Sequence, residues 1–118
     1  MTYEEFDRFC AALPATSPVV QWGGAHVWKV GGRMFAVGGW DEAVPAYTFK
    51  VSPLSFEILR ALPGLRPAPY LASRGLNWIQ HYAVPGLRDP ELREYLKESH
   101  RLVARGLSGK RRRDLGLE

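Results

Sequence analysis

The chain has 118 residues, 46% hydrophobic and 24% charged, a composition that is ordinary for one globular domain and unlike disordered or fibrous proteins. No window approaches the roughly 20 apolar residues of a membrane helix, and the acidic N-terminus is unlike a secretory leader, so we expect a cytoplasmic protein with no membrane partner. Cys10 is the one cysteine, which excludes an intrachain disulfide.

The positive charge is concentrated in the second half of the sequence. Residues 1–59 carry four Lys and Arg against six Asp and Glu, whereas residues 60–118 carry twelve against six. A basic surface raises the local concentration of phosphates, so nucleic acid is the first partner to consider. A solvated helix face with a soluble tail is the alternative, because charge alone does not distinguish the two.

The first predicted element is a helix over residues 3–13. Thr2 and Glu5 form a capping-box pattern, apolar residues follow at helical spacing, and Pro14 ends the pattern. Cys10 lies on the apolar stripe, which predicts a packed thiol and not a nucleophile, since reactive thiols need an accessible electropositive site.

A hairpin is the clearest feature of the following segment. Two β-favouring runs, 26–30 and 33–37, flank the dipeptide Gly31-Gly32, and glycine reaches the positive φ that a two-residue turn requires. A shorter run over 19–22 precedes them through a second glycine pair, Gly23-Gly24. The first antiparallel strands of a sheet are therefore predicted here.

A fourth strand and a second helix are predicted next. Residues 47–51 alternate between apolar and polar side chains, which indicates a strand with one wet face. Ser52 is a typical helix cap and Pro53 fits a first helical turn, so a helix is expected over 53–62. Three residues at helical spacing are expected on its buried side: Leu54, Ile58 and Leu62.

The last predicted strand covers residues 77–83, and two interpretations of its faces stay open. Either Trp78 and Tyr82 face the core, or Ile79 and His81 do. An aromatic residue on a strand is more often part of the core than a platform for stacking bases, and this holds for Trp78.

The final helix begins at Asp89-Pro90 and ends near Gly106, because acidic residues follow its start and glycines its end. The run Lys110-Arg111-Arg112-Arg113 comes after it. Like charges in a row repel each other, so we expect an extended, solvated tail there.

This order of helix, strands, helix, strand and helix predicts an α+β domain of two layers, an antiparallel sheet with the N-terminal, middle and C-terminal helices packed on one side. We expect the domain over residues 1–109 and a basic tail over 110–118. If the other side of the sheet is open, Lys29, Thr48 and Lys50 lie on it.

No pattern of catalytic or metal-binding residues is recognisable. His26, His81 and His100 are too far apart for a zinc signature, and the adjacent carboxylates of Glu4-Glu5 and Asp41-Glu42 do not converge on one bond. The glycine pairs lie within strand-rich sequence and not in a phosphate-binding loop. We therefore expect no enzyme activity, no metal and no cofactor.

Seven features, taken in their order and spacing, point to one family. They are Ala12-Leu13-Pro14, Trp22-Gly23, Val30-Gly31-Gly32-Arg33-Met34-Phe35-Ala36, Lys50-Val51-Ser52-Pro53, Pro67-Ala68-Pro69-Tyr70-Leu71, Trp78, and Ser99-His100-Arg101-Leu102-Val103-Ala104 before a basic terminus. The chain resembles, nearly end to end, the MmcQ/YjbR family of small bacterial proteins. Arg33 stands where lysine is common and His100 where tyrosine is expected, and both departures leave the fold expectation intact.

The resemblance implies a CyaY-like fold, a double-wing mode of contacting DNA, and no established catalytic activity. Frataxin-type proteins share a similar fold and bind iron through an acidic ridge near the first helix. This chain offers only Glu4, Glu5 and Asp7 there, so we do not expect iron binding.

The first functional hypothesis is non-enzymatic DNA binding through phosphate contacts with little sequence specificity. The candidate contacts are Lys29, Arg33, Lys50, Arg74, His81, Lys110, Arg111, Arg112 and Arg113, with Trp78 as a stacking or wedge residue. The alternative is a protein- or small-ligand-binding module that uses an aromatic-rich sheet face, with a pocket rimmed by Trp40, Tyr70 and Trp78.

Overall fold

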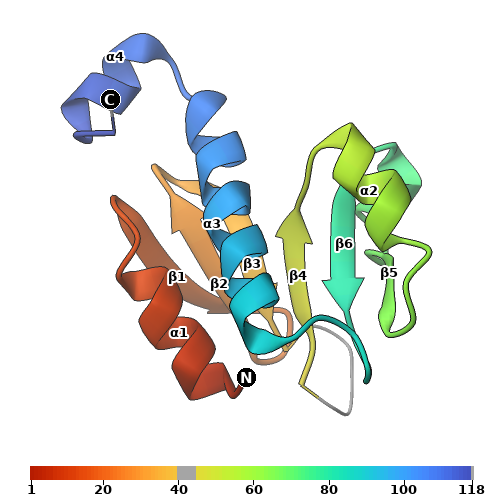
Figure 1. Ribbon diagram of the computed structural model, residues 1–118. Helices are drawn as coiled ribbons and strands as arrows, with labels where there is room; N and C mark the ends of the chain where they lie inside the picture. Colours follow the sequence, from red (N-terminus) through yellow and green to blue (C-terminus); the bar gives the residue numbers. More distant parts are fainter. Residues whose placement is uncertain (40–44, 118) are drawn as a thin grey trace.

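In the computed structural model, which describes residues 1–39 and 45–117, the chain forms one antiparallel sheet covered by helices. The strands in these ranges are β1 (Thr16–Gln21), β2 (Ala25–Val30), β3 (Arg33–Gly38), β4 (Tyr47–Lys50), β5 (Leu65–Pro67) and β6 (Trp78–His81). The helices are α1 (Tyr3–Ala11), α2 (Pro53–Leu59), η1 (Ala72–Arg74), α3 (Asp89–Arg105) and α4 (Gly109–Asp114). The strand order is β1-β2-β3-β4-β6-β5. Because α1, α2 and α3 lie on the same face of the sheet (Figure 1), the predicted α+β architecture is confirmed.

The core lies between this face of the sheet and the helices. Phe6 from α1, Leu96 from α3, and Phe35 and Phe49 from the central strands are fully buried. Burial of each such side chain stabilises the fold by roughly 1.5–3 kcal/mol. Cys10 is buried on α1 as predicted, and this burial raises the pKa of its thiol above the usual range.

The first helix and the first strand differ from the predictions mainly at their ends. The capping box is present, with the Glu5 amide donating to Thr2 Oγ1 over 3.1 Å and the Thr2 amide donating to Glu5 Oε1 over 2.9 Å. β1 begins earlier than expected and includes Pro18, which pairs in register with Trp28. A proline fits here because β1 is an edge strand, on which one row of amide groups needs no partner.

A β-bulge in β3 is tied to α3 by one buried serine. The ladder between β2 and β3 shifts at Trp28/Lys29 and leaves Phe35 without a register partner. Ser99 Oγ donates a hydrogen bond of 2.6 Å to the Phe35 carbonyl and accepts one of 2.8 Å from the Lys50 amide. The helix thus satisfies backbone groups that a bulge leaves outside the regular ladder.

Both faces of β6 are buried, which resolves the open question about this strand. Ile79 and His81 face the helices, because their register partners in β4 do so, and Trp78 and Gln80 face the opposite side. Trp78 is nevertheless only 6% exposed, because the segment over residues 68–77 passes over this half of the sheet. The alternation predicted two candidate core faces, and the fold uses both.

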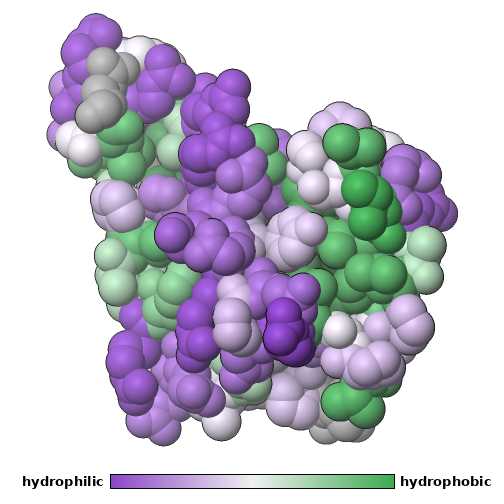
Figure 2. Space-filling model, in the orientation of Figure 1, coloured by the Kyte–Doolittle hydropathy of each residue, from purple (hydrophilic) through white to green (hydrophobic). Residues whose placement is uncertain are grey.

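The predicted buried side of α2 is wrong. Leu54, Ile58 and Leu62 are exposed, Leu54 at 72%, while Phe56 and Leu59 face the core. Figure 2 shows the resulting hydrophobic surface over α2. The helix is only two turns long, so its orientation follows the large Phe56 ring and not the longer stripe that the spacing suggested.

The basic run at the C-terminus forms helix α4 and is not an extended tail. Ser108 caps α4 by accepting a hydrogen bond of 3.1 Å from the Arg111 amide. Leu107 and Leu115, before and after the run, both pack on the β2–β3 turn at Gly31. Apolar contacts on either side of the basic residues therefore offset their mutual repulsion.

Candidate nucleic-acid interface

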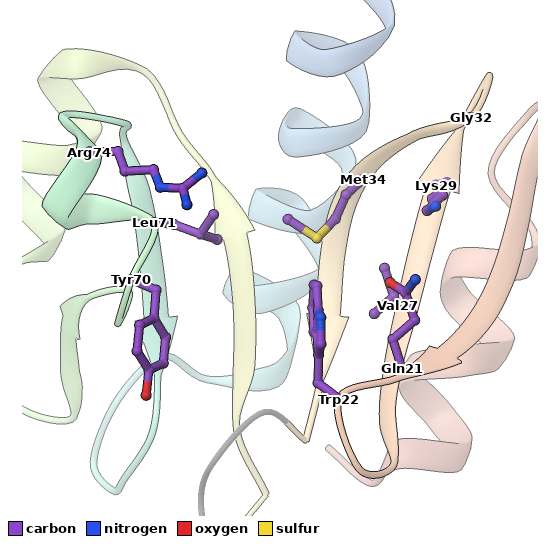
Figure 3. A pocket seen from close by; sticks show the side chains of 9 residues that line it. All are labelled: Gln21, Trp22, Val27, Lys29, Gly32, Met34, Tyr70, Leu71 and Arg74. Atoms are coloured by element: carbon purple, nitrogen blue, oxygen red, sulfur yellow. The ribbon is translucent and has the colours of Figure 1, made fainter.

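A groove of about 410 Å³ lies on the sheet face opposite the helices. Strands β1 to β3 and the two turns that join them line one side with Gln21, Trp22, Val27, Lys29, Gly32 and Met34. The segment around η1 lines the other side with Tyr70, Leu71 and Arg74 (Figure 3). The segment around η1 thus covers the β4–β6 half of this face, and the groove lies beside it over β1 to β3, where Val27 and Val37 are also buried.

Two cations line this groove from opposite sides. Lys29 projects from β2, and the Arg74 side chain extends from η1 toward the β3 side of the groove (Figure 3). No carboxylate in residues 1–39 or 45–117 lies within ion-pair distance of either one. Their charge is therefore available to an anionic ligand.

Two exposed aromatic residues in an unusual backbone conformation also line the groove. Trp22 is 52% exposed and Tyr70 is 64% exposed, and their φ angles are +51° and +68°. A left-handed conformation costs a residue with a side chain roughly 1–2 kcal/mol, so the surrounding turns must hold it. The Gly24 amide donates to the Gln21 carbonyl over 3.2 Å on one side, and Leu71 donates to Pro69 over 2.8 Å on the other.

Further basic residues gather at the end of the β2–β3 hairpin, beside the groove. We call them the hairpin-end cluster: Arg33, Arg105, Lys110, Arg111, Arg112 and Arg113. Arg33 Nη1 donates to the Gly106 carbonyl over 3.3 Å, and Arg111 Nη2 donates to the Gly31 carbonyl over 3.4 Å. Because the next residue, Gly32, lines the groove, the cluster and the groove adjoin.

The helix layer carries a different kind of basic surface, in which the cations are paired. Its ion pairs are Arg8–Glu4, Arg60–Glu57, Arg88–Glu91, Arg93–Glu5, Lys97–Glu94 and Arg101–Glu98. Such exposed pairs add little stability, yet each one neutralises its own charge locally. In the described part of the chain, Arg33, Lys110, Arg111 and Arg113 have no such partner. The excess positive charge therefore lies at the hairpin end and along the groove.

Comparison with protein families gives a match to the YjbR family model over residues 11–102. The chain belongs to the YjbR family. No curated protein is similar enough to this YjbR protein to count as a relative.

Two solved structures extend the comparison of this YjbR protein beyond the family model. A Deinococcus radiodurans protein with a DUF419 domain is 26% identical, with a TM-score of 0.84 over 99% of this chain and 89% of that one. A Pseudomonas syringae protein is 20% identical, with a TM-score of 0.69 over 86% of this chain and 98% of that one. The second likeness shows a shared fold alone.

The fold brings together most of the basic residues that the sequence suggested. Lys29 and Arg74 line the groove from opposite sides, Lys50 lies on the same sheet face, and the hairpin-end cluster includes Arg33 and the run 110–113. Sequence reasoning missed Trp22 as a groove residue, although its place beside a glycine pair was a usable signal. Trp40 and Asp41-Glu42 lie outside the described residues.

Two predicted contacts lie elsewhere in this YjbR protein. Trp78 is on the groove side of the sheet but buried, so it leaves no surface for stacking. His81 lies on the helix side, beside a second cavity of about 330 Å³ that Tyr47 and Leu92 also line. A half-buried side chain on that face does not join the basic surface.

No helix in residues 1–39 and 45–117 is both long and apolar enough to cross a membrane. The same ranges hold no group of three or more His, Cys, Asp or Glu placed to bind a metal ion. Asp7, from the acidic start of α1, accepts hydrogen bonds from His26 Nδ1 at 2.7 Å and Trp28 Nε1 at 2.9 Å.

The burial of His81 predicts that acid destabilises the protein. Its two ring nitrogens are buried without a hydrogen-bond partner among the described residues, and this burial lowers its pKa. In the unfolded state the histidine pKa is about 6.5, so the unfolded chain binds the proton more readily than the folded protein does. The stability that His81 contributes is therefore fully present above about pH 6.5 and is lost as the pH falls toward the lower pKa of the folded state. We expect the urea midpoint to decrease between about pH 7.5 and 5.

The His81→Gln variant should show a smaller decrease over the same pH range. Nuclear magnetic resonance titration of the wild-type ring gives an independent measurement that needs no variant. A His81 ring that titrates at or above the unfolded value contradicts the prediction.

Proposed function

We propose that this protein binds DNA without catalysing a reaction, and that it contacts phosphates mainly with the hairpin-end cluster. One observation carries the proposal: Arg33, Lys110, Arg111 and Arg113 lie at one end of the molecule with no carboxylate partner among residues 1–39 and 45–117, whereas most cations of α1, α2 and α3 are paired. Arginine is suited to this role because its planar guanidinium binds phosphate oxygens in a bidentate manner.

Little sequence specificity is expected from this arrangement. Phosphate contacts fix the position of a protein on DNA but carry no sequence information. The cluster holds no Asn or Gln, the residues that pair with adenine edges. α4 spans only Gly109–Asp114, too short for a helix that lies along the major groove. The β2–β3 hairpin with Arg33 at its turn is the element that we assign as one wing of a double-wing contact.

Binding to a duplex at different salt concentrations tests the proposal. Contact with about four phosphates gives a slope of roughly −3.6 in log affinity against log salt. Replacing both Arg111 and Arg113 by alanine should reduce this slope by about 1.8 and the affinity at low salt by roughly tenfold or more.

The matched control replaces Arg8 and Arg101 by alanine, which removes the same net charge from the helix layer. Its affinity should stay within about twofold of wild type, since both residues are locally neutralised in the native protein. Absence of duplex binding by the wild type at low salt, or equal losses in the two double variants, contradicts the proposal.

A second candidate function is binding of a small ligand, and the groove is the observation that favours it. Its volume lies in the range of about 300–1,000 Å³ that ligand sites occupy, and aromatic, apolar and cationic groups line it. Ligand binding in the groove alone would survive the loss of Arg111 and Arg113, which distinguishes it from duplex binding by the cluster.

A further inference from the structure

We propose that the groove binds one nucleotide with its base out of the stack, the base lying against Trp22 and Tyr70 and the phosphate near Arg74 and Lys29. The inference rests on the proposed function and deepens it, since it assigns the groove a ligand that the duplex contacts of the hairpin-end cluster do not need. The nucleotide is either part of a single strand or free in solution.

The apolar lining of the groove suits the face of a single unstacked base. The side chains of Val27 and Met34 make the floor of the groove apolar, and Leu71 adds an apolar side chain from the opposite wall. A nucleobase likewise has two apolar π-faces, and its polar groups lie on its edges. A stacked and paired base has both faces covered, so only an unstacked one fits this surface.

The two aromatic residues of the groove are exposed and have strained backbones. Trp22 and Tyr70 are each more than half exposed, and each has a positive φ. Backbone strain of this kind clusters at binding sites. Stacking on aromatic side chains tolerates every base, in agreement with the low specificity proposed above.

The polar groups of the groove complement the rest of a nucleotide. Lys29 and Arg74 supply positive charge for the phosphate. Gln21 offers both a donor and an acceptor, which matches the edge of any base. A Cβ at Gly32 would meet no atom within 4 Å, so the backbone there is open to a strand that continues toward Arg33. The groove and the hairpin-end cluster would thus hold neighbouring parts of one strand.

The test compares a thymidine oligonucleotide of about twelve residues with an abasic oligonucleotide of the same length, using fluorescence anisotropy. The abasic strand keeps every phosphate and lacks every base. We expect the thymidine strand to bind about 5- to 150-fold more tightly. Trp22→Leu and Tyr70→Leu should each reduce that advantage at least about fivefold and leave duplex and abasic binding unchanged.

Leu54→Ala is the matched control, because it removes an exposed apolar side chain from α2, away from the groove, and should change nothing. Equal binding of the thymidine and abasic strands, with duplex binding intact, overturns the groove assignment and leaves DNA binding by the cluster in place. Failure of every nucleic acid to bind overturns both. Thymidine monophosphate distinguishes the two kinds of nucleotide. If it binds and its binding depends on Trp22, the ligand of the groove is a free nucleotide. If only the thymidine strand binds, the ligand is a segment of single-stranded nucleic acid.

Discussion

The Ser99→Ala variant is expected to lose roughly 2–6 kcal/mol of unfolding free energy, a large part of the stability of a domain this size. Ser99 Oγ is fully buried and serves both the Phe35 carbonyl and the Lys50 amide. Each buried backbone group left without a partner costs about 1–3 kcal/mol, and an alanine at this position leaves two. The variant also loses the link between α3 and the bulge of β3.

Urea unfolding at constant pH measures this effect, with Ser17→Ala as the matched control. Ser17 is an exposed serine on edge strand β1, so its loss should change stability by less than about 0.5 kcal/mol. If the unfolding free energy of Ser99→Ala lies within about 1 kcal/mol of the wild-type value, the bulge does not depend on this side chain.

The Gly31→Val variant is expected to lose duplex affinity roughly tenfold although it changes no charge. Gly31 has a φ of +57°, and a Cβ there would lie 2.8 Å from Leu107 Cδ1 and 2.9 Å from Leu115 Cδ1. These leucines hold α4 against the hairpin. The added side chain therefore displaces α4, and the arginines of the hairpin-end cluster no longer converge on one strand of DNA.

Gly24→Val is the control for backbone strain. Gly24 has a φ of +116° and nothing within 4 Å of its Cβ position, so valine adds unfavourable backbone energy but no contact with α4. Both variants should lose stability, and only Gly31→Val should lose duplex affinity. If the two variants bind the duplex with equal affinity, DNA binding does not depend on the docking of α4, and the prediction is wrong.

Much of the fold follows from local signals in the sequence. The capping box at Thr2 and Glu5 and the glycine pair at Gly31-Gly32 each depend on contacts within a few residues, and both are present. Such signals act through backbone conformation and near neighbours, so the sequence carries them directly. The predicted ends of the elements were less accurate. β1, for example, begins earlier than predicted, because pairing with β2 decides where this edge strand begins.

The orientation of α2 and the state of the basic run required the tertiary structure. The stripe of Leu54 and Ile58 has helical spacing but is exposed, while Phe56 packs into the core on the side where α2 meets β5 and β6. Charge repulsion favoured an extended tail, whereas Leu107 and Leu115 find an apolar contact at the hairpin turn. In both cases a distant part of the chain outweighs the local pattern.

The sequence by itself determined the α+β class, the hairpin with its glycine turn, the positive charge of the second half and the resemblance to the YjbR family. The tertiary structure alone decided which cations act together. Carboxylates three or four residues away neutralise most cations of α1, α2 and α3, whereas the turn at Gly31-Gly32 brings α4, Arg33 and the groove to one end. Coulomb interactions depend on distance in space and not on separation in sequence, so only the folded chain shows where the charge accumulates.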